Sequence, residues 1–347
     1  ALDPDNAFIR LVMNEGIFSD ATGTLPIESS DLQILFNSNG GAATAASISS
    51  LKKTDQNELT GNEDTVLVYI ELTNGPASGV ETVEIKAAGG GSIYNSIGNA
   101  LTEEETTNPI TLNDKLVPSI LSASLSLDTL AAITISESIF TESNGTNPLT
   151  LADIALIFSS NGGNATSANL SLITKSDGSP LEGGETDVSV HFVVDDIARG
   201  SETIEIKPQD NNSIFDLSGN PMADDQTSGL LTLPDRLQPE IDSTKTTIAS
   251  SNAYVALSIS EGLYTNAAGD AALLVSDFTI EFDDNGGNAT AAEIANITKA
   301  GGNSLAGNED SLWLYLDVTG TPSGEEKVMI QPEDAVSVYD DNGNAME

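Results

Sequence analysis

One stretch of the sequence occurs three times and sets the organisation of the whole chain. It reads "FNSNGGAATAASISSLKK" from residue 36, "FSSNGGNATSANLSLITK" from residue 158 and "FDDNGGNATAAEIANITK" from residue 282. A second element, "MNEGIF", returns as "ISESIF" and "ISEGLY", so that Glu15, Glu137 and Glu261 are equivalent and are spaced by 122 and 124 residues. Such constant spacing requires a shared core, because turns absorb insertions and paired strands do not. The chain is therefore predicted to contain three copies of one domain.

Each copy is a series of short runs in which apolar and polar residues alternate. In the second copy these runs include "AAITIS", "DIALIF", "DVSVHFVV" and "SETIEIK", with Gly, Asn, Asp or Pro between them. Alternation at period two is typical of strands, and about seven strands in roughly 115 residues are typical of an Ig-like β-sandwich. We expect an all-β chain of three tandem Ig-like β-sandwich domains in an elongated arrangement, over residues 1–116, 117–237 and 238–347.

The "NGG" of the recurring stretch is a candidate for either a binding site or a turn. It follows the apolar end of a strand, and two glycines permit the positive φ angles of a tight connection. Turn chemistry alone explains these residue types, so we interpret the stretch as scaffold.

Two short linkers connect the copies, "TLNDKLVPSI" (111–120) and "TLPDRLQPEI" (232–241). Their prolines, Pro118 and Pro239, restrict the backbone and predict short, stiff joints. The first copy begins too late to contain its first strand in full, and the third stops at "DNGNAME", before the equivalent of the last strand. We expect a segment of a longer array with open sheet edges, which favour pairing between molecules.

The charge of the chain narrows the choice of partners. With 53 acidic and 12 basic residues, the formal net charge is −41. The Lys and Arg side chains that neutralise phosphate are scarce, so neither nucleic acid nor an anionic membrane is an expected partner. Divalent cations, high salt or solubility alone are compatible with this charge. There is no cysteine, and no apolar run approaches the roughly 18 residues that span a bilayer.

No enzyme signature is present in the sequence. The single histidine, His191, occupies the strand position of Tyr69 and Tyr315 and has no recurring partner that would make it a general base. The sequence contains no nucleophile elbow, no phosphate-binding glycine loop and no histidine pair for zinc. We therefore expect a protein that is not an enzyme.

Carboxylates that recur at loop positions are the candidate ligands of a metal. They lie at the end of the second strand of each copy, before the third strand, before the longest strand and in the linkers. The candidates are Glu15, Asp31, Glu63, Asp114, Glu137, Asp153, Glu185, Asp235, Glu261, Asp277 and Glu309. Calcium takes six to eight hard oxygen ligands from flexible loops, so these residues predict calcium at the domain junctions. Turn capping by the Asp residues and solvated strand ends for the Glu residues remain the structural alternatives.

A last recurrent element reads "IYNSIGN", "IFDLSGN" and "VYDDNGN". An apolar strand end, an Asx residue and then Gly-Asn are typical of an Asx-turn that leads to a positive φ. The first copy has Asn95 where the others have Asp216 and Asp340. This difference favours a structural role over metal ligation for the element.

The succession "SEGLYTN", "SDFTIEF", "GTPSGEEKVMIQP" and "VYDDNGNAM" resembles the Ig-like repeats of large bacterial cell-surface proteins, the repeats of adhesins and S-layer-type proteins. The resemblance covers all three copies, and its motifs are turn and core motifs. It implies an exported, non-enzymatic extender or adhesive rod at the cell surface, in some cases rigidified by calcium.

Three functions compete on this evidence. The favoured one is a structural or adhesive segment whose partners are other repeats of the same protein and a carbohydrate or protein of the cell surface or matrix. The alternative is an array of carbohydrate-binding modules that accompanies a secreted hydrolase, but Trp313 is the only tryptophan and has Leu67 and Ser189 at its equivalents. An enzyme would need an insertion in one repeat, and the constant spacing leaves no room for one.

Overall fold

The computed structural model describes residues 1–347, which form strands and three short 3-10 helices. The first repeat contains β1 (Phe8–Phe18), η1 (Ser29–Asp31), β2 (Leu32–Asn37), β3 (Ala45–Lys52), β4 (Glu63–Thr73), β5 (Thr82–Ala87), β6 (Tyr94–Asn95) and β7 (Ile110–Thr111). The second contains β8 (Ile120–Leu127), β9 (Leu130–Phe140), η2 (Leu151–Asp153), β10 (Ile154–Ser159), β11 (Ala168–Thr174), β12 (Glu185–Val194), β13 (Thr203–Pro208), β14 (Phe215–Asp216) and β15 (Leu231–Thr232). The third contains β16 (Thr247–Ile248), β17 (Tyr254–Leu263), η3 (Val275–Asp277), β18 (Phe278–Asp283), β19 (Ala291–Lys299), β20 (Glu309–Thr319) and β21 (Lys327–Pro332).

Each repeat has two antiparallel sheets, and the all-β, sandwich-like fold confirms the predicted structural class. In the second repeat the sheet β11-β12-β9-β14, with β8 paired to β9, faces the sheet β10-β13-β15. The first repeat has β3-β4-β1-β6 and β2-β5-β7, and the third has β16-β17-β20-β19 and β18-β21. The apolar residues that alternate along these strands point inward, as in "TIEIKP" of β13, where Ile204 and Ile206 are buried.

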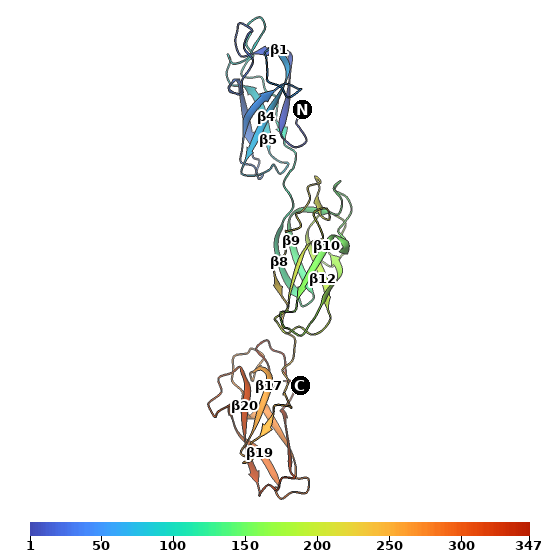
Figure 1. Ribbon diagram of the computed structural model, residues 1–347, viewed down its shortest axis with the longest axis vertical. Coiled ribbons are helices and arrows are strands. Elements are labelled where there is room, and N and C mark those ends of the chain that lie inside the picture. Colours follow the sequence, from blue (N-terminus) through green and yellow to red (C-terminus); the bar gives the residue numbers. More distant parts are fainter.

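The molecule contains three separate hydrophobic cores, one in each repeat. They extend over Ile9–Leu112, Ala131–Leu233 and Val255–Met346. The three bodies follow one another end to end, and a single length of chain joins each to the next (Figure 1). No helix has the length and apolar character needed to cross a membrane.

The "NGG" stretch is a turn that fits around a buried carboxylate. Asn39 and Gly40 adopt positive φ angles of 49° and 86°, and the Asn39 side chain donates a hydrogen bond to the Val80 carbonyl at 2.8 Å. A Cβ on Gly41 would clash with the carboxylate of Glu81, which is fully buried. The same arrangement joins Gly163 to Glu202 and Gly287 to Glu326. The recurrence of this stretch is therefore explained by scaffold geometry.

In each repeat the strand that carries the recurrent glutamate (Glu15, Glu137 or Glu261) is not paired with its neighbouring strand around that residue. Pairing of β1 with β4 is interrupted between Val12 and Ile17, and pairing of β17 with β20 between Ser258 and Leu263. In the second repeat the irregularity in the β9–β12 ladder extends from Thr134 to Ile139. Because a bulge turns a side chain out of the regular alternation, it can aim Glu137 toward the end of the domain.

The outer strands of the repeats differ. In the second repeat β8 pairs along β9 from Leu130 to Ile135, whereas in the first repeat only a bridge between Leu2 and Ile9 occupies that edge of β1. In the third repeat β21 pairs with β18 alone, and no strand corresponds to β7 or β15.

Candidate metal centre at the repeat junctions

Three carboxylates from two repeats meet at the first junction. Asp114 lies in the linker after β7, Glu137 lies on the bulged part of β9, and Asp216 ends β14. One carboxylate oxygen of each residue lies within 4.8 Å of the corresponding oxygens of the other two. The preceding repeat thus contributes one acidic group to the cluster and the following repeat contributes two.

Local backbone geometry fixes Asp216 and Asp114. Oδ1 of Asp216 accepts hydrogen bonds from the backbone N–H groups of Ser218 and Asn220, both at 2.8 Å, which is the predicted Asx-turn. Oδ2 accepts from Nδ2 of Asn220 at 2.7 Å. Asp114 accepts from the backbone N–H of Leu116 at 3.0 Å. Both carboxylates are therefore held in place before any ligand binds.

The side chain of Asn220 also ties the two repeats together. Its Nδ2 lies 3.3 Å from the carbonyl oxygens of both Asp114 and Leu116 in the linker. Oγ of Ser218 donates to the Asp114 carboxylate, also at 3.3 Å. These three contacts join the end of the first repeat to the second repeat beside the acidic cluster.

Glu137 is the member of the cluster whose charge is least satisfied. Its Oε1 is buried and has no hydrogen-bond partner. Burial, with the neighbouring Asp216 and Asp114 carboxylates, raises the pKa of Glu137 from 4.5 to about 7. Burial and Asp216 also raise the pKa of Asp114. A bound cation would neutralise this repulsion and give the orphaned oxygen a partner.

The second junction repeats the arrangement with Asp235, Glu261 and Asp340. One carboxylate oxygen of each residue again lies within 4.8 Å of those of the other two, and Asp340 is fully buried. Asp340 accepts from the backbone N–H groups of Asn342 and Asn344 at 2.9 and 2.8 Å, and Nδ2 of Asn344 lies 3.3 Å from the Asp235 carbonyl. Oε1 of Glu261 is again buried without a partner. Burial and the Asp235 and Asp340 charges raise the pKa of Glu261 to about 7.

Two charged residues distinguish the second junction from the first, Arg199 and Asp341. Arg199 forms an isolated backbone β-bridge with Asp235. Burial and the neighbouring acids raise the pKa of Asp235 and of Glu261, and the positive charge of Arg199 opposes this rise. The equivalent residue at the first junction is Ser78. The second junction therefore adds one basic residue, Arg199, and one acidic residue, Asp341, which stands where the second repeat has Leu217.

Of the three cluster positions, the first repeat has a carboxylate only at Glu15. Asn95 stands where the other repeats have Asp216 and Asp340, and its Nδ2 donates to Oε1 of Glu15 at 3.1 Å. Glu15 is exposed, and no acidic cluster forms around it. The side-chain amide of Asn95 thus gives Glu15 a hydrogen-bond donor, which Oε1 of Glu137 and Oε1 of Glu261 lack.

The remaining predicted ligands are used inside turns. Asp31, Asp153 and Asp277 accept the backbone N–H groups of Glu28, Thr150 and Leu274 at 2.7–2.8 Å and so cap the 3-10 helices. Glu63, Glu185 and Glu309 accept backbone N–H groups of the preceding turn and pair with Lys53, Lys175 and Lys299 at 3.4, 3.9 and 3.1 Å. With Glu15, these residues do not join a group of three acids.

Of the predicted residues, the structure brings together Asp114 with Glu137 and Asp235 with Glu261. Asp216 and Asp340 complete the clusters, although the sequence favours a structural role for them. In each of them one oxygen closes the Asx-turn, and the carboxylate also lies within the acidic cluster. The signal for Asp216 and Asp340 in the sequence is the asparagine at the equivalent position, Asn95, because the repeat that contains it has no acidic cluster.

The donor set fits calcium better than a softer metal. Every side-chain donor is a carboxylate or hydroxyl oxygen, and the sequence contains no cysteine. Hard oxygen donors suit calcium, magnesium and manganese, and calcium tolerates the irregular geometry of loops. No family model, no curated protein and no solved structure matches the chain.

Proposed function

We propose that the chain is a non-enzymatic segment of a large exported bacterial surface protein, in which Ig-like repeats form a stiff extender or adhesion rod. Calcium at the two junction clusters supplies the stiffness. The place of action in this proposal is the cell surface. The proposed partners are neighbouring repeats of the same protein and a carbohydrate or protein of the surface or matrix.

The observation that carries the proposal is the division of each cluster between two repeats. Asp114 and Asp235 come from the repeat before the junction, and Glu137 with Asp216 or Glu261 with Asp340 come from the repeat after it. A cation bound by all three residues stabilises only those orientations in which the repeats keep their present alignment. The end-to-end arrangement of the three bodies supports an extended particle (Figure 1).

The carbohydrate-binding alternative needs exposed aromatic rings. Trp313 on β20 stacks on Tyr254 with ring centroids 4.3 Å apart, and Tyr315 lies 5.7 Å from Tyr254. The stacking covers one face of the only tryptophan, and neither other repeat has an equivalent. These contacts favour a packing role for Trp313.

Small-angle X-ray scattering with and without calcium tests the proposed function. We expect one narrow set of extended dimensions in calcium and a broader, shorter distribution in EDTA. The double variant Asp216→Asn/Asp340→Asn should give the broad distribution in both conditions. The control variant Glu15→Gln keeps both clusters and should respond as the unmodified chain does. Identical scattering in calcium and EDTA would contradict calcium-dependent stiffness.

A further inference from the structure

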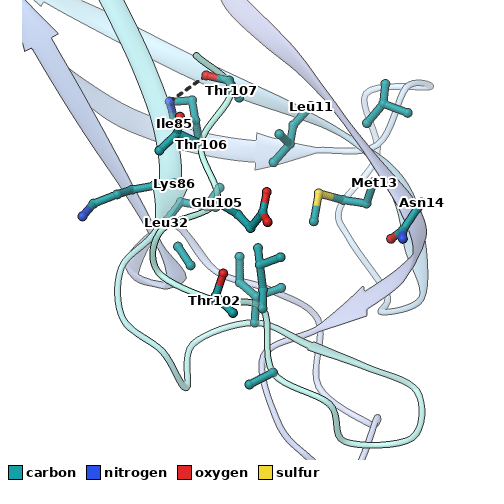
Figure 2. Close-up of a pocket in the computed structure, with 15 residues that line it drawn as sticks. Leu11, Met13, Asn14, Leu32, Ile85, Lys86, Thr102, Glu105, Thr106 and Thr107 are labelled. Carbon is teal, nitrogen blue, oxygen red and sulfur yellow. Dashed lines mark hydrogen bonds between the residues drawn. The ribbon is translucent and has the colours of Figure 1, made fainter. Parts of the chain in front are cut away.

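The last segment of the first repeat is held along β5 and continues into the linker. The backbone N–H of Ile85 on β5 donates to Oγ1 of Thr107 at 3.0 Å (Figure 2). Strand β7 then pairs with β5, and beyond β7 the backbone N–H of Lys115 donates to the carbonyl of Ala77 at 2.7 Å. The first linker is therefore attached to the first repeat as far as Lys115.

The second linker is attached to the second repeat at the equivalent position and by one further contact. The backbone N–H of Arg236 donates to the carbonyl of Ala198 at 2.8 Å. The guanidinium of Arg236 donates from Nε and Nη2 to the two carboxylate oxygens of Asp128, both at 2.8 Å, and Asp128 lies in the turn between β8 and β9. Two parallel hydrogen bonds to one carboxylate fix the direction of an arginine as well as its distance. At the first linker, Lys115 makes a single ionic contact, to Asp5 at 3.0 Å.

Asp235, the cluster residue of the second linker, directly precedes Arg236. A Cβ added to Gly200 would lie 3.2 Å from the Cβ of Asp235, so the aspartate packs directly on the turn that leads into β13. The positive charge that opposes the raised pKa of Asp235 is that of Arg199. The guanidinium of Arg236 is instead paired with Asp128. Arg236 is thus placed to act on the cluster through the backbone of Asp235 rather than through its own charge.

The chain joins the third repeat directly beside the cluster. The backbone N–H of Glu240 donates to Oγ of Ser260, and the N–H of Ser260 donates to the Glu240 carbonyl, both at 2.9 Å. Ser260 immediately precedes Glu261 of the cluster. Between these two attachments, the backbone of residues 237–239 makes no hydrogen bond to the body of either repeat. The unattached part of the joint is therefore three residues long, and the acidic cluster lies across it.

We propose that Arg236 is a positioning residue for cation binding at the second junction. Its pair with Asp128 holds the linker on the second repeat, so that the Asp235 carboxylate keeps its place in the cluster. Residues 237–239 then form the hinge between the two repeats, and a cation bound at the cluster fixes the angle of this hinge. A ligand group that is already held in its bound position raises affinity, because binding has less to order. This role rests on the proposed function, in which a cation occupies the cluster.

Calorimetric titration with calcium tests this role in the Asp216→Asn background, in which the first junction has lost one carboxylate. We expect Arg236→Gln to weaken calcium binding roughly two- to fivefold, the range that an exposed ion pair supports. The sign is decisive, because removal of a positive charge from a chain of net charge −41 would by itself strengthen the binding of a cation. Arg10→Gln makes the same charge change on β1 and should have little effect. Arg236→Lys keeps the charge and should recover part of the loss.

Hydrogen exchange in EDTA tests the attachment of the linker without the cation. In the variant Asp128→Asn the amide of Arg236, which donates to Ala198, should exchange at least about threefold faster than in the unmodified chain. The equivalent amide of Lys115 in the first linker is the matched control and should keep its rate.

Two results would overturn the proposal. One is an unchanged exchange rate of the Arg236 amide in the Asp128→Asn variant. The other is stronger or unchanged calcium binding in the Arg236→Gln variant. Absence of calcium binding in the Asp216→Asn background itself would contradict the proposed function, and the exchange rates alone would then decide whether Arg236 holds the linker.

Discussion

Asp114 ends the first repeat and Glu137 lies on a strand of the second, and their carboxylate oxygens approach within 4.8 Å of each other. Two negative groups so close are unfavourable when both are ionised. The linker nevertheless holds Asp114 there, because its carboxylate accepts a hydrogen bond from Leu116 and its Cβ packs against Gly79. The junction therefore keeps a repulsive contact that a bound divalent cation would relieve.

Asp216→Asn should abolish calcium binding at the first junction. The substitution reproduces the residue found at position 95, keeps an oxygen for the Asx-turn and removes one charge from the cluster. In thermal unfolding, calcium at 100 times its dissociation constant stabilises the native chain by about 2.7 kcal/mol per site, and this gain at the first junction should be lost. Glu15→Gln serves as the control. An unchanged calcium response of the Asp216→Asn variant would exclude this residue as a ligand.

Stability in EDTA should depend on pH through Glu137 and Glu261. The pKa of each is raised from 4.5 to about 7, so the folded chain binds these protons more tightly than the unfolded chain. Their favourable contribution is therefore complete below about pH 4.5 and is lost as the pH rises to about 7.

The double variant Glu137→Gln/Glu261→Gln isolates this effect from the other acids. In EDTA its unfolding midpoint should exceed that of the unmodified chain at pH 8 and approach it near pH 4.5. In calcium the unmodified chain should be the more stable one at pH 8. A difference between the two chains that stays constant over this range in EDTA would contradict the assigned pKa shifts.

Arg199→Ser should strengthen calcium binding at the second junction. The change supplies the residue that the first junction has at Ser78 and removes a positive charge that competes with the cation. Calorimetric titration at low salt should show an affinity gain of roughly two- to tenfold, which declines as salt screens the charge. Arg10→Ser makes the same charge change on β1, away from both clusters, and should have little effect. Equal affinity gains in the two variants would mean that the net charge of the whole chain, and not the position of Arg199, sets the calcium affinity.

Gly41→Ala should destabilise the first repeat. The new Cβ would meet the Glu81 carboxylate, which is fully buried and accepts backbone hydrogen bonds from Ala43 and Ser78. Forcing atoms into a packed site costs about 1–3 kcal/mol of unfolding free energy, which denaturant unfolding can measure. Gly90→Ala is the matched control, because no atom lies within 4 Å of its added Cβ. Equal stability of the two variants would show that the turn at Gly41 can shift away from the Glu81 carboxylate without cost.

The sequence predicted the strands and turns well because the alternation of residues such as Ile204 and Ile206 directly reflects which face is buried. It also placed Asp114 and Glu137 at a junction, since one lies in a linker and the other at a strand end. It missed Asp216 and Asp340 because an Asx-turn explains each aspartate without reference to the carboxylates that other segments bring near it. It also gave no sign that Glu81, Glu202 and Glu326 are turn-locking carboxylates, since their partners are backbone groups distant in the chain.

The most direct measurement is a calorimetric titration of the metal-free chain with calcium at neutral pH, compared with the double variant Asp216→Asn/Asp340→Asn. We expect two calcium ions per chain, one for each cluster, weaker binding of magnesium and no binding by the double variant. Absence of binding by the unmodified chain, or equal binding by the double variant, would contradict calcium-locked junctions.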